Sequence, residues 1–308
     1  MKIRNYVFII GFLAVMNVFC WHEVFVLSEP RLLKVDFFDV GQGDAAFIET
    51  PNHRQILIDG GPDSVVLEKL ANKMPFWDKT IDIVILSHPE KDHMTGILEV
   101  LQRYKVDYFL WSGVFKDNAE SKKLAMILDQ VQRPRSNFWA HFAAFFAAAK
   151  NAAYTKVSAV SAGEKIKIDG AEIDILFPFE NIGGKQLKDS ASANDTCIVD
   201  KITYGKNSFL FIGDISSTIE KQLVNSGENI LANVLKVAHH GSKYSTSDLF
   251  LENVRPEIAV ISVGKNSYGH PTPEVLQKLE NFGIQIKRTD TEGDVEIVSD
   301  GQNIKLNN

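Results

Sequence analysis

The chain has 308 residues, with 33 Lys plus Arg against 39 Asp plus Glu, so its formal net charge is −6, and 45% of its residues are apolar. This composition supplies enough apolar surface for one large or two modest cores, which excludes a largely disordered chain and a polytopic membrane protein. An acidic chain has no overall positive field for nucleic acid, and its two cysteines are too few for a disulfide framework or a thiolate zinc site, so any metal would be held by His and carboxylates.

The first 22 residues differ from the rest of the chain. An uncharged run from Asn5 to His22 follows the basic residues Lys2 and Arg4. Its length is near the lower limit for a membrane-spanning helix, and the basic flank would stay in the cytoplasm. We therefore expect residues 1–4 to be a cytoplasmic tip and residues 5–22 to be a signal anchor or signal peptide of a bacterial cell membrane, with the rest outside. The run is followed by no small-x-small cleavage site, which favours an anchor, and it has no polar face, which disfavours a buried first helix.

From residue 32 to 308, short β-type runs alternate with helical runs, and no repeat or low-complexity linker divides them. Turns are indicated at 51–54, at Asp169-Gly170 and at Gly205-Lys206-Asn207. We expect one α/β domain in which two mixed sheets pack together with helices outside. The predicted strands are 32–40, 45–50, 55–61, 78–87, 164–168, 171–177, 196–204, 208–214, 233–240, 257–263 and 285–289, and the predicted helices are 93–105, 247–253 and 273–282.

One stretch departs from this alternation. Residues 136–154 are rich in Ala and crowded with Phe and Trp. The pattern favours a helix packed on the domain. An exposed flap over the active site and a helix that touches a membrane are the alternatives.

Histidines gather at the ends of predicted apolar strands. A single histidine in such a place is commonly a satisfied core residue. Several together indicate a site, because the sheet holds the backbone while the adjoining loops leave side chains free to reach a ligand. The histidines at or just beyond strand ends are His88, His93, His239, His240 and His270.

The segment from Ser87 to His93 holds four potential metal ligands, at positions 88, 90, 92 and 93. In an extended loop the first three would share one side while 92 and 93 diverge, so the segment could serve two neighbouring ions. Asp214 ends another predicted strand, where its carboxylate could bridge both ions. A solvated charged loop is the alternative, but the other strand-end groups favour a metal site.

These motifs resemble those of a known superfamily. His88-x-Glu90-x-Asp92-His93, with Asp59 in LIDGG and Asp214 in FIGD, is similar to the metal-binding pattern of the metallo-β-lactamase fold. More narrowly, the chain resembles the C-terminal soluble domain of the ComEC/Rec2 family of DNA-uptake channel proteins over nearly all of its length from residue 32. The family's channel-forming helices have no counterpart here, so we do not expect a pore function. The motifs that carry the resemblance are FFDVGQGDA, LIDGG, SHPEKDH, NDTCIVDKITYG, FIGD, KVAHHGS and NSYGHP.

The resemblance implies a fold and a site. The fold would be a four-layer αββα sandwich with two mixed sheets between layers of helices. The site would hold two divalent metal ions, Zn or Mn. By the resemblance, one ion would be held by His88, Glu90 and Asp214, and the other by Asp92, His93, Asp214 and one C-terminal histidine.

The spacing along the chain leaves the last metal ligand open among His239, His240 and His270. We assign His270 to the ligand set and His239 and His240 to catalysis, as groups that face the substrate and transfer a proton; Asp92 is assigned to both. Asp59 is expected to orient a ligand histidine rather than to bind metal. The further residues expected to contact the ligands or the substrate are Gln42, Asp44, Asn194, Asp195 and Ser242.

The sequence departs from the superfamily pattern at two places. Position 90 is Glu where the superfamily has His, and the third motif offers Asn194 and Asp195 but no histidine. One ion position is therefore rich in oxygen ligands. Because such ligands suit Mn²⁺ better than Zn²⁺, we expect Mn²⁺ to compete with Zn²⁺ for the site.

The function implied is that of a metal-dependent phosphodiesterase, in first place a competence-related nuclease that acts on DNA outside the cytoplasmic membrane, with a separate channel protein as a possible partner. A phosphodiesterase for a small or cell-wall phosphodiester is one alternative. A metal-poor module that binds DNA or a protein is the other. A basic rim for DNA could be formed by Lys116, Lys122, Lys123, Arg133, Arg135, Lys236, Lys243 and Lys265.

Overall fold

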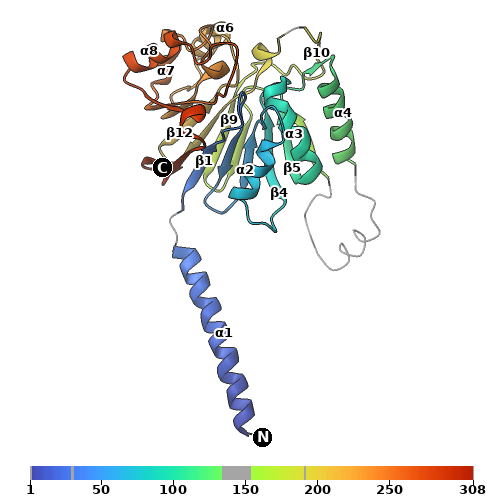
Figure 1. Ribbon diagram of the computed structural model, residues 1–308, viewed down its shortest axis with the longest axis vertical. Coiled ribbons are helices and arrows are strands. Elements are labelled where there is room, and N and C mark those ends of the chain that lie inside the picture. Colours follow the sequence, from blue (N-terminus) through green and yellow to red (C-terminus); the bar gives the residue numbers. More distant parts are fainter. Residues whose placement is uncertain (1, 29–30, 134–153, 191, 308) are drawn as a thin grey trace.

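The computed structural model describes residues 2–28, 31–133, 154–190 and 192–307. All of the predicted segment 136–154 except Tyr154 therefore lies outside the described residues, and so does Arg135. Two sheets lie face to face, and helices cover their outer sides (Figure 1).

The first sheet is built from both ends of the chain. Its eight strands are β1 (Leu33–Phe37), β2 (Ala46–Glu49), β3 (Gln55–Ile58), β4 (Thr80–Leu86), β5 (Lys105–Trp111), β7 (Lys156–Ala159), β16 (Val295–Ser299) and β17 (Ile304–Asn307). They run in the order β17-β16-β1-β2-β3-β4-β5-β7, so the C-terminal hairpin pairs with β1. The hairpin between β2 and β3 turns at the predicted position, where the Thr50 amide donates to the carbonyl of Arg54. β3, β4, β5 and β7 are parallel.

The second sheet has seven strands in the order β15-β14-β13-β12-β11-β9-β8. They are β8 (Lys165–Ile168), β9 (Ala171–Phe177), β11 (Val199–Tyr204), β12 (Asn207–Phe211), β13 (Val234–Lys236), β14 (Ile258–Ile261) and β15 (Gln285–Arg288). The turn between β8 and β9 has Asp169 and Gly170 at φ 48° and 83°, the left-handed values that match the twist of a hairpin. From β12 to β15 the strands are parallel. A small parallel pair joins β6 (Phe115–Lys116) to β10 (Gln186–Leu187).

Helices form the two outer layers, and apolar side chains fill the three spaces between layers. α2 (Val65–Lys73), α3 (Lys91–Arg103) and α4 (Ala119–Val131) cover the first sheet; α6 (Ser217–Ser226), α7 (Asp248–Val254) and α8 (Pro273–Asn281) cover the second, and the short α9 (Thr289–Glu292) follows β15. Successive side chains of a strand point to opposite faces of the sheet, so one strand contributes to two cores. In β3, Ile56 and Ile58 face the other sheet, while Leu57 faces the helices. The predicted two-sheet α/β sandwich with helices outside is thus confirmed.

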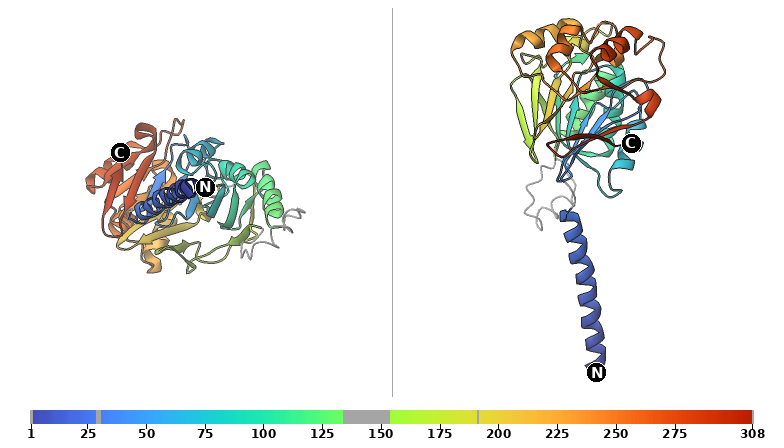
Figure 2. Two further views of the ribbon diagram at one scale, coloured as in Figure 1. Left: turned by 90° about the horizontal axis from the view of Figure 1, so that it is seen from below. Right: turned by 90° about the vertical axis from the view of Figure 1, so that its left-hand side faces the viewer.

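The first helix, α1 (Lys2–Ser28), lies apart from the two sheets in Figures 1 and 2. The side chains of residues 8–21 are exposed along it. Among the residues that the structure describes, no helix combines the length and the apolar character needed to cross a membrane. The span predicted for residues 5–22 is therefore not confirmed.

Candidate metal centre

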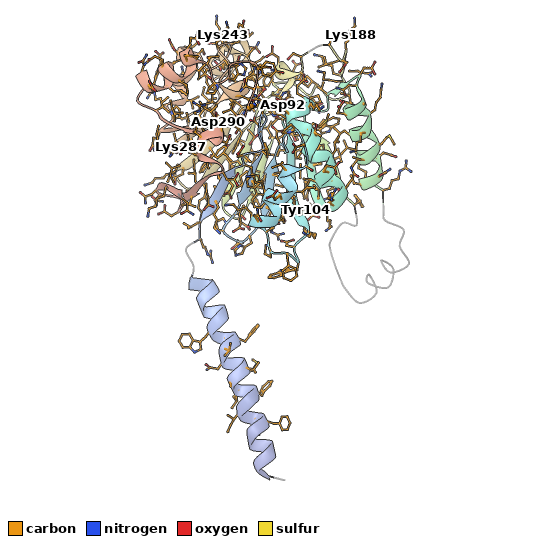
Figure 3. The ribbon with its side chains drawn as sticks, viewed as in Figure 1. Asp92, Tyr104, Lys188, Lys243, Lys287 and Asp290 are labelled. Carbon is orange, nitrogen blue, oxygen red and sulfur yellow. The ribbon has the colours of Figure 1, made fainter. Side chains whose placement is uncertain are left out.

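The candidate site lies where strands of both sheets end. Asp59 directly follows β3, Asp214 closely follows β12, and His240 lies just beyond β13 in a short 3-10 turn, Ala238–Gly241. β3 and β4 are parallel in one sheet, and β12, β13 and β14 are parallel in the other. Their carboxyl ends therefore meet at one end of the sandwich. Figure 3 shows Asp92 at this end and Tyr104 at the opposite end.

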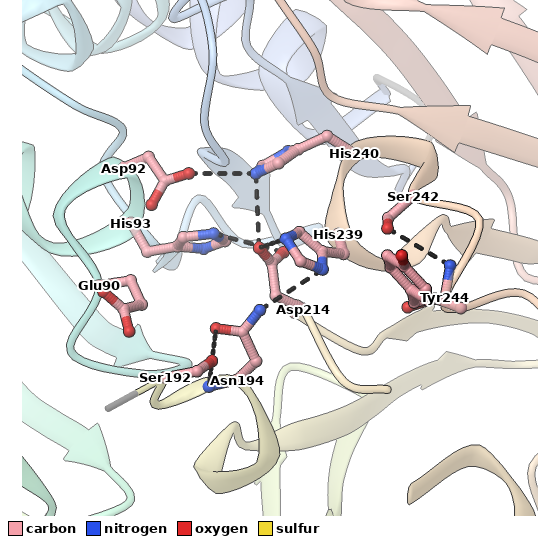
Figure 4. Close-up of polar contacts among 12 residues, drawn as sticks. Glu90, Asp92, His93, Ser192, Asn194, Asp214, His239, His240, Ser242 and Tyr244 are labelled. Carbon is pink, nitrogen blue, oxygen red and sulfur yellow. Dashed lines mark hydrogen bonds and ion pairs between the residues drawn. The ribbon is translucent and has the colours of Figure 1, made fainter. Parts of the chain in front are cut away.

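Four side chains converge there, each with a ligand atom within 4.8 Å of the others: Asp92, His93, Asp214 and His240. His93 Nε2 lies 3.4 Å from Asp214 Oδ1, and His240 Nε2 lies 3.2 Å from Asp92 Oδ2 and 3.5 Å from Asp214 Oδ2 (Figure 4). Within the described residues, the buried atoms His93 Nε2 and Asp214 Oδ1 have no hydrogen-bond partner. Because unpaired buried polar atoms are costly, this set of imidazoles and carboxylates fits a divalent cation.

Two of the four side chains come from the first turn of a helix. The motif predicts an extended loop over residues 88–92, but α3 begins at Lys91 and Glu90 is its extended N-cap residue, with φ −94° and ψ 154°. Asp92 and His93 therefore project about 100° apart from the helix axis. The N-terminal end of the helix also favours a carboxylate such as that of Asp92.

Asp59 lies directly behind the His93 ring. Its Oδ2 lies 2.8 Å from His93 Nδ1, so Nε2 is the ring atom that faces Asp214. Ser87 holds the carboxylate in turn: its amide donates to Asp59 Oδ1 at 2.8 Å and its hydroxyl to Oδ2 at 2.6 Å. A carboxylate behind an imidazole is the usual arrangement around a metal-binding histidine. The structure thus places Asp59 where its predicted orienting role requires, and the role itself stays a prediction.

The histidine pair occupies a strained turn. His239 and His240 have φ values of 50° and 55°, and Gly241 follows at 84°. Residues other than glycine rarely adopt this left-handed backbone conformation, and backbone strain of this kind is concentrated at functional sites. The turn sends His240 into the cluster, where its Nδ1 also lies 2.8 Å from the carbonyl oxygen of Ser262. His239 stays at the edge of the cluster, with its Nε2 3.9 Å from Asp214 Oδ2.

The GQGD loop and a buried lysine complete the lining. Asp44 forms ion pairs with Lys236 and with His240, whose Nδ1 lies 3.4 Å from Asp44 Oδ1. Lys236 Nζ also lies 3.6 Å from Asp214 Oδ1. Gly43, at φ 152°, packs so closely on the carbonyl oxygen of Asp92 that a Cβ there would overlap it. Glycine is therefore needed at this position for both reasons.

The charges of the cluster shift its proton affinities in opposite directions. Burial lowers the pKa of His240, but the carboxylates of Asp214 and Asp44 outweigh it and raise that pKa to about 10. Burial raises the pKa of Asp214, but the charges of His240 and His93 bring it well below its ordinary value. Without a metal ion, the carboxylates therefore keep the neighbouring imidazoles protonated. An imidazole must lose that proton to bind a metal ion, so cation binding and protonation compete.

The remaining residues of the SHPEKDH motif do not join the cluster. Both carboxylate oxygens of Glu90 accept from Lys116 Nζ, at 2.9 and 3.0 Å, and Oε1 also accepts from the amide of Ala193 at 2.9 Å. His88 is buried, its ring centroid is 4.2 Å from that of His93, and its Nε2 has no partner among the described residues. Burial lowers the pKa of His88 to about 3, so this imidazole is neutral.

The third motif approaches His239 rather than the cluster. The side-chain amide of Asn194 donates to His239 Nδ1 at 3.4 Å, and its carbonyl oxygen accepts from the Ser192 hydroxyl at 2.8 Å. Asp195 is exposed and accepts from the amide of Ser216 at 3.3 Å. The structure therefore brings Asn194 to the edge of the site, whereas Asp195 is exposed and is not part of the cluster.

His270 lies outside the cluster, on the side of His239. Their ring centroids are 5.5 Å apart, and Tyr268 lies a further 5.8 Å beyond His270. Of the three candidates for the last ligand, the structure therefore brings His240 and not His270 to Asp92, His93 and Asp214. Gln42 accepts from the amide of Gly264 at 3.3 Å, and Ser242 Oγ accepts from the amide of Tyr244 at 3.4 Å.

Two lysines that the sequence analysis offered for a basic rim are buried in the site. Lys236 pairs with Asp44 and Asp214, and Lys116 pairs with Glu90. The prediction that Lys116 and Lys236 belong to a basic rim is therefore wrong. Lys236 stands inside the apolar strand VLKVA, a position that signals a buried ion pair because an unpaired ammonium there would be too costly. No sequence signal identifies Lys116, since its partner is 26 positions away.

No protein-family model matches the chain. The chain is 31% identical over 281 residues to ComE operon protein 3 of Bacillus subtilis (strain 168), covering 85% of the chain and 32% of that protein. It is 27% identical to Recombination protein 2 of Haemophilus influenzae, covering 88% of the chain and 29% of that protein, and 27% identical to Competence protein ComA of Neisseria gonorrhoeae, covering 84% and 31%. The chain thus spans about a third of the length of these curated relatives.

A solved structure shares the fold. The metallo-β-lactamase fold protein YhfI from Bacillus subtilis superposes with a TM-score of 0.53, at 14% sequence identity, covering 86% of this chain and 99% of that chain. At this identity the likeness concerns the arrangement of sheets and helices alone.

Proposed function

The chain is a metallo-β-lactamase-fold protein that is homologous to one segment of the ComEC/Rec2 competence proteins, and on that premise we propose that it is a metal-dependent phosphodiesterase whose substrate is DNA. The observation that carries the proposal is the convergence of Asp92, His93, Asp214 and His240 at the end of the sandwich where the parallel strands finish. A divalent cation bound there would lower the pKa of water and neutralise charge on a phosphoryl group.

Neighbouring residues of the chain would orient the metal ligands and contact the substrate. Asp59 holds His93 with Nε2 toward the cluster, and Ser262 holds His240 through its Nδ1. His239 is the partly exposed imidazole beside the cluster, with 35% of its side chain accessible. Burial lowers its pKa, so the ring is neutral, and because Asn194 donates to Nδ1 the proton sits on Nε2. We assign His239 to hydrogen-bond the leaving oxygen through this Nε2–H and so to stabilise its developing negative charge, while water supplies the proton.

The surroundings of the cluster support nucleic acid over a small diester. Tyr244 and Tyr268 lie near His239 and His270 with 69% and 73% of their surface exposed, and Lys243 Nζ is 5.3 Å from the ring centroid of Tyr244. Exposed rings next to ammonium groups are how proteins bind single strands, because every base presents a π face and every nucleotide a phosphate. The names of the relatives connect them with competence and recombination, which agrees with DNA as the substrate.

Two substrates test the proposal. The full chain would be assayed with plasmid and single-stranded DNA, and with bis-p-nitrophenyl phosphate, each with Mn²⁺, with Zn²⁺ and with EDTA. We expect metal-dependent cleavage of both classes and its loss in Asp214→Asn. Cleavage of the small diester alone would reassign the substrate to a small or cell-wall phosphodiester. No cleavage of either, with DNA still bound, would reassign the chain to a binding module.

We also propose that the domain acts outside the cytoplasmic membrane, attached through residues 5–22. The support is the order of a basic tip, an uncharged run and the domain, together with the exposed apolar side chains along α1, such as Phe12 and Phe19. Cell fractionation and protease treatment of spheroplasts test this location. Recovery of the chain in the cytosolic fraction would contradict it. A channel protein as partner stays a prediction.

A further inference from the structure

One carboxylate of the motif is already neutralised by the protein itself. Glu90 lies in the position that the resemblance assigns to the first metal ion, yet both of its carboxylate oxygens accept hydrogen bonds from Lys116, at 2.9 and 3.0 Å, and one accepts from the Ala193 amide. Lys116 is no surface residue, since only 7% of its side chain is accessible. The lysine comes from β6, a strand held in place by its parallel partner β10.

The other expected donor on this side is engaged as well. The Asn194 amide nitrogen donates to His239 Nδ1, and its carbonyl oxygen accepts from the Ser192 hydroxyl. His88 Nε2 alone stays unpaired on this side, among the residues that the structure describes. A transition metal in a protein is usually held by about three protein ligands. At the position of the second ion, the available ligands are His88 and Asp214, and Asp214 would be shared with the first ion. The donor set therefore does not fit a second ion.

A second cation would also displace Lys116. To bind Glu90 it would have to break three hydrogen bonds and leave the Lys116 ammonium unpaired in a position that is 7% accessible to water. Removing one partner of a buried ion pair is strongly unfavourable, because the remaining charge is left without solvent or counter-charge. The lysine thus competes with the ion for the same carboxylate and is held there by the fold.

We propose that this chain takes one divalent cation, at Asp92, His93, Asp214 and His240, and that the Lys116 ammonium supplies opposite Glu90 the positive charge that a second ion would supply in a two-ion site. The inference rests on the proposed function in one respect, because it presupposes that the four-residue cluster binds metal. It differs from the two-ion site that the resemblance implies, and it makes Lys116 a positioning residue that decides how many ions the site holds.

Metal stoichiometry tests the proposal without reference to activity. The full chain, kept in solution with a mild detergent, is freed of metal, dialysed against Mn²⁺ and assayed for manganese per chain and by electron paramagnetic resonance. We expect one Mn²⁺ per chain with the spectrum of an isolated ion. Two ions per chain, with a spin-coupled spectrum, would overturn this inference and leave the proposed function standing, whereas no bound ion would overturn both.

Variants at Lys116 test its role directly. Lys116→Met keeps the length of the side chain and removes the charge, which frees Glu90, and we expect the stoichiometry to rise from one ion to two. Lys116→Arg keeps the charge and should stay at one. Lys123→Met removes an exposed lysine that pairs with Glu99 and should also stay at one. If Lys116→Met folds and still binds one ion, Lys116 does not decide the stoichiometry. If it does not fold, the count for the unaltered chain still decides whether the site holds one ion.

Discussion

The two halves of the candidate site use neighbouring residues of one motif in opposite ways. Asp92 and His93 face Asp214 and His240, and within the described residues the buried atoms His93 Nε2 and Asp214 Oδ1 have no partner, an arrangement that fits a divalent cation. Two positions earlier in the chain, Glu90 is satisfied by Lys116 and a backbone amide. The difference teaches that a ligand-type residue in a ligand-type motif is a metal ligand only if no other group of the protein has already paired with it.

Removal of the shared carboxylate should have the largest effect. Asp214 touches both imidazoles of the cluster, so Asp214→Asn is expected to lower Mn²⁺ affinity and hydrolysis by more than the roughly 10- to 100-fold that is typical of a residue outside the ligand set. Isothermal titration and DNA cleavage would measure both losses, and circular dichroism would verify the fold. Full activity in this variant would show that the cluster is not the metal site.

A matched pair of substitutions in the motif compares the two halves directly. Asp92→Asn should weaken Mn²⁺ binding by about 100-fold, because it removes a ligand. Glu90→Gln should change it by less than about threefold and instead lower the free energy of unfolding by about 2 kcal/mol, because it leaves the Lys116 ammonium without a counter-charge. Equal losses of metal affinity would mean that Glu90 coordinates.

The late histidines differ in whether they reach the cluster. His240→Asn is expected to reduce Mn²⁺ affinity as much as Asp92→Asn does, since His240 Nε2 faces both Asp92 and Asp214. His270→Asn should leave the affinity within about threefold, because its ring packs on His239 outside the cluster. The reverse order of losses would restore His270 as the last ligand. Titrations of the two variants under one buffer condition decide between them.

The last prediction concerns protein stability rather than metal binding, at the buried carboxyl of Asp200 outside the four-residue cluster. Asp200 on β11 is buried, and burial, with the charge of Asp59 added, raises its pKa well above the ordinary value. A carboxyl whose pKa is raised by folding makes the native state less stable as the pH rises above the unfolded pKa near 4, by about 1.4 kcal/mol for each unit of the shift that is crossed. Asp200→Asn should therefore gain stability over the unaltered chain from pH 4 to pH 8.

Urea unfolding of Asp200→Asn and of the unaltered chain at both pH values measures this difference. A gain that is the same at pH 4 and pH 8 would mean that the carboxyl is not held protonated by burial. Asp195→Asn is a suitable control, because Asp195 is exposed and lies away from the cluster.

Local patterns determined much of the fold. The apolar runs that became β3, β4, β12 and β14 and the turns at 51–54, Asp169-Gly170 and Gly205 were all readable, because alternation and turn chemistry are properties of a few adjacent residues. None of the predicted elements corresponds to helix α2, and none of the patterns predicts that β16 and β17 return to pair with β1. That pairing joins residues far apart in the chain, which no local pattern specifies.

For the site, local sequence patterns identify residues with the side-chain chemistry to bind a metal and place them at strand ends. Which of these residues meet depends on how the two sheets pack: His240 joins the cluster rather than His270, and Asp92 joins it but Glu90 does not. The tertiary structure also showed Lys236 and Lys116 as buried counter-charges. The physical reason is that a ligand's availability depends on what packs against it, and the partner of Glu90 arrives from another strand whose approach is set by the packing of the whole domain.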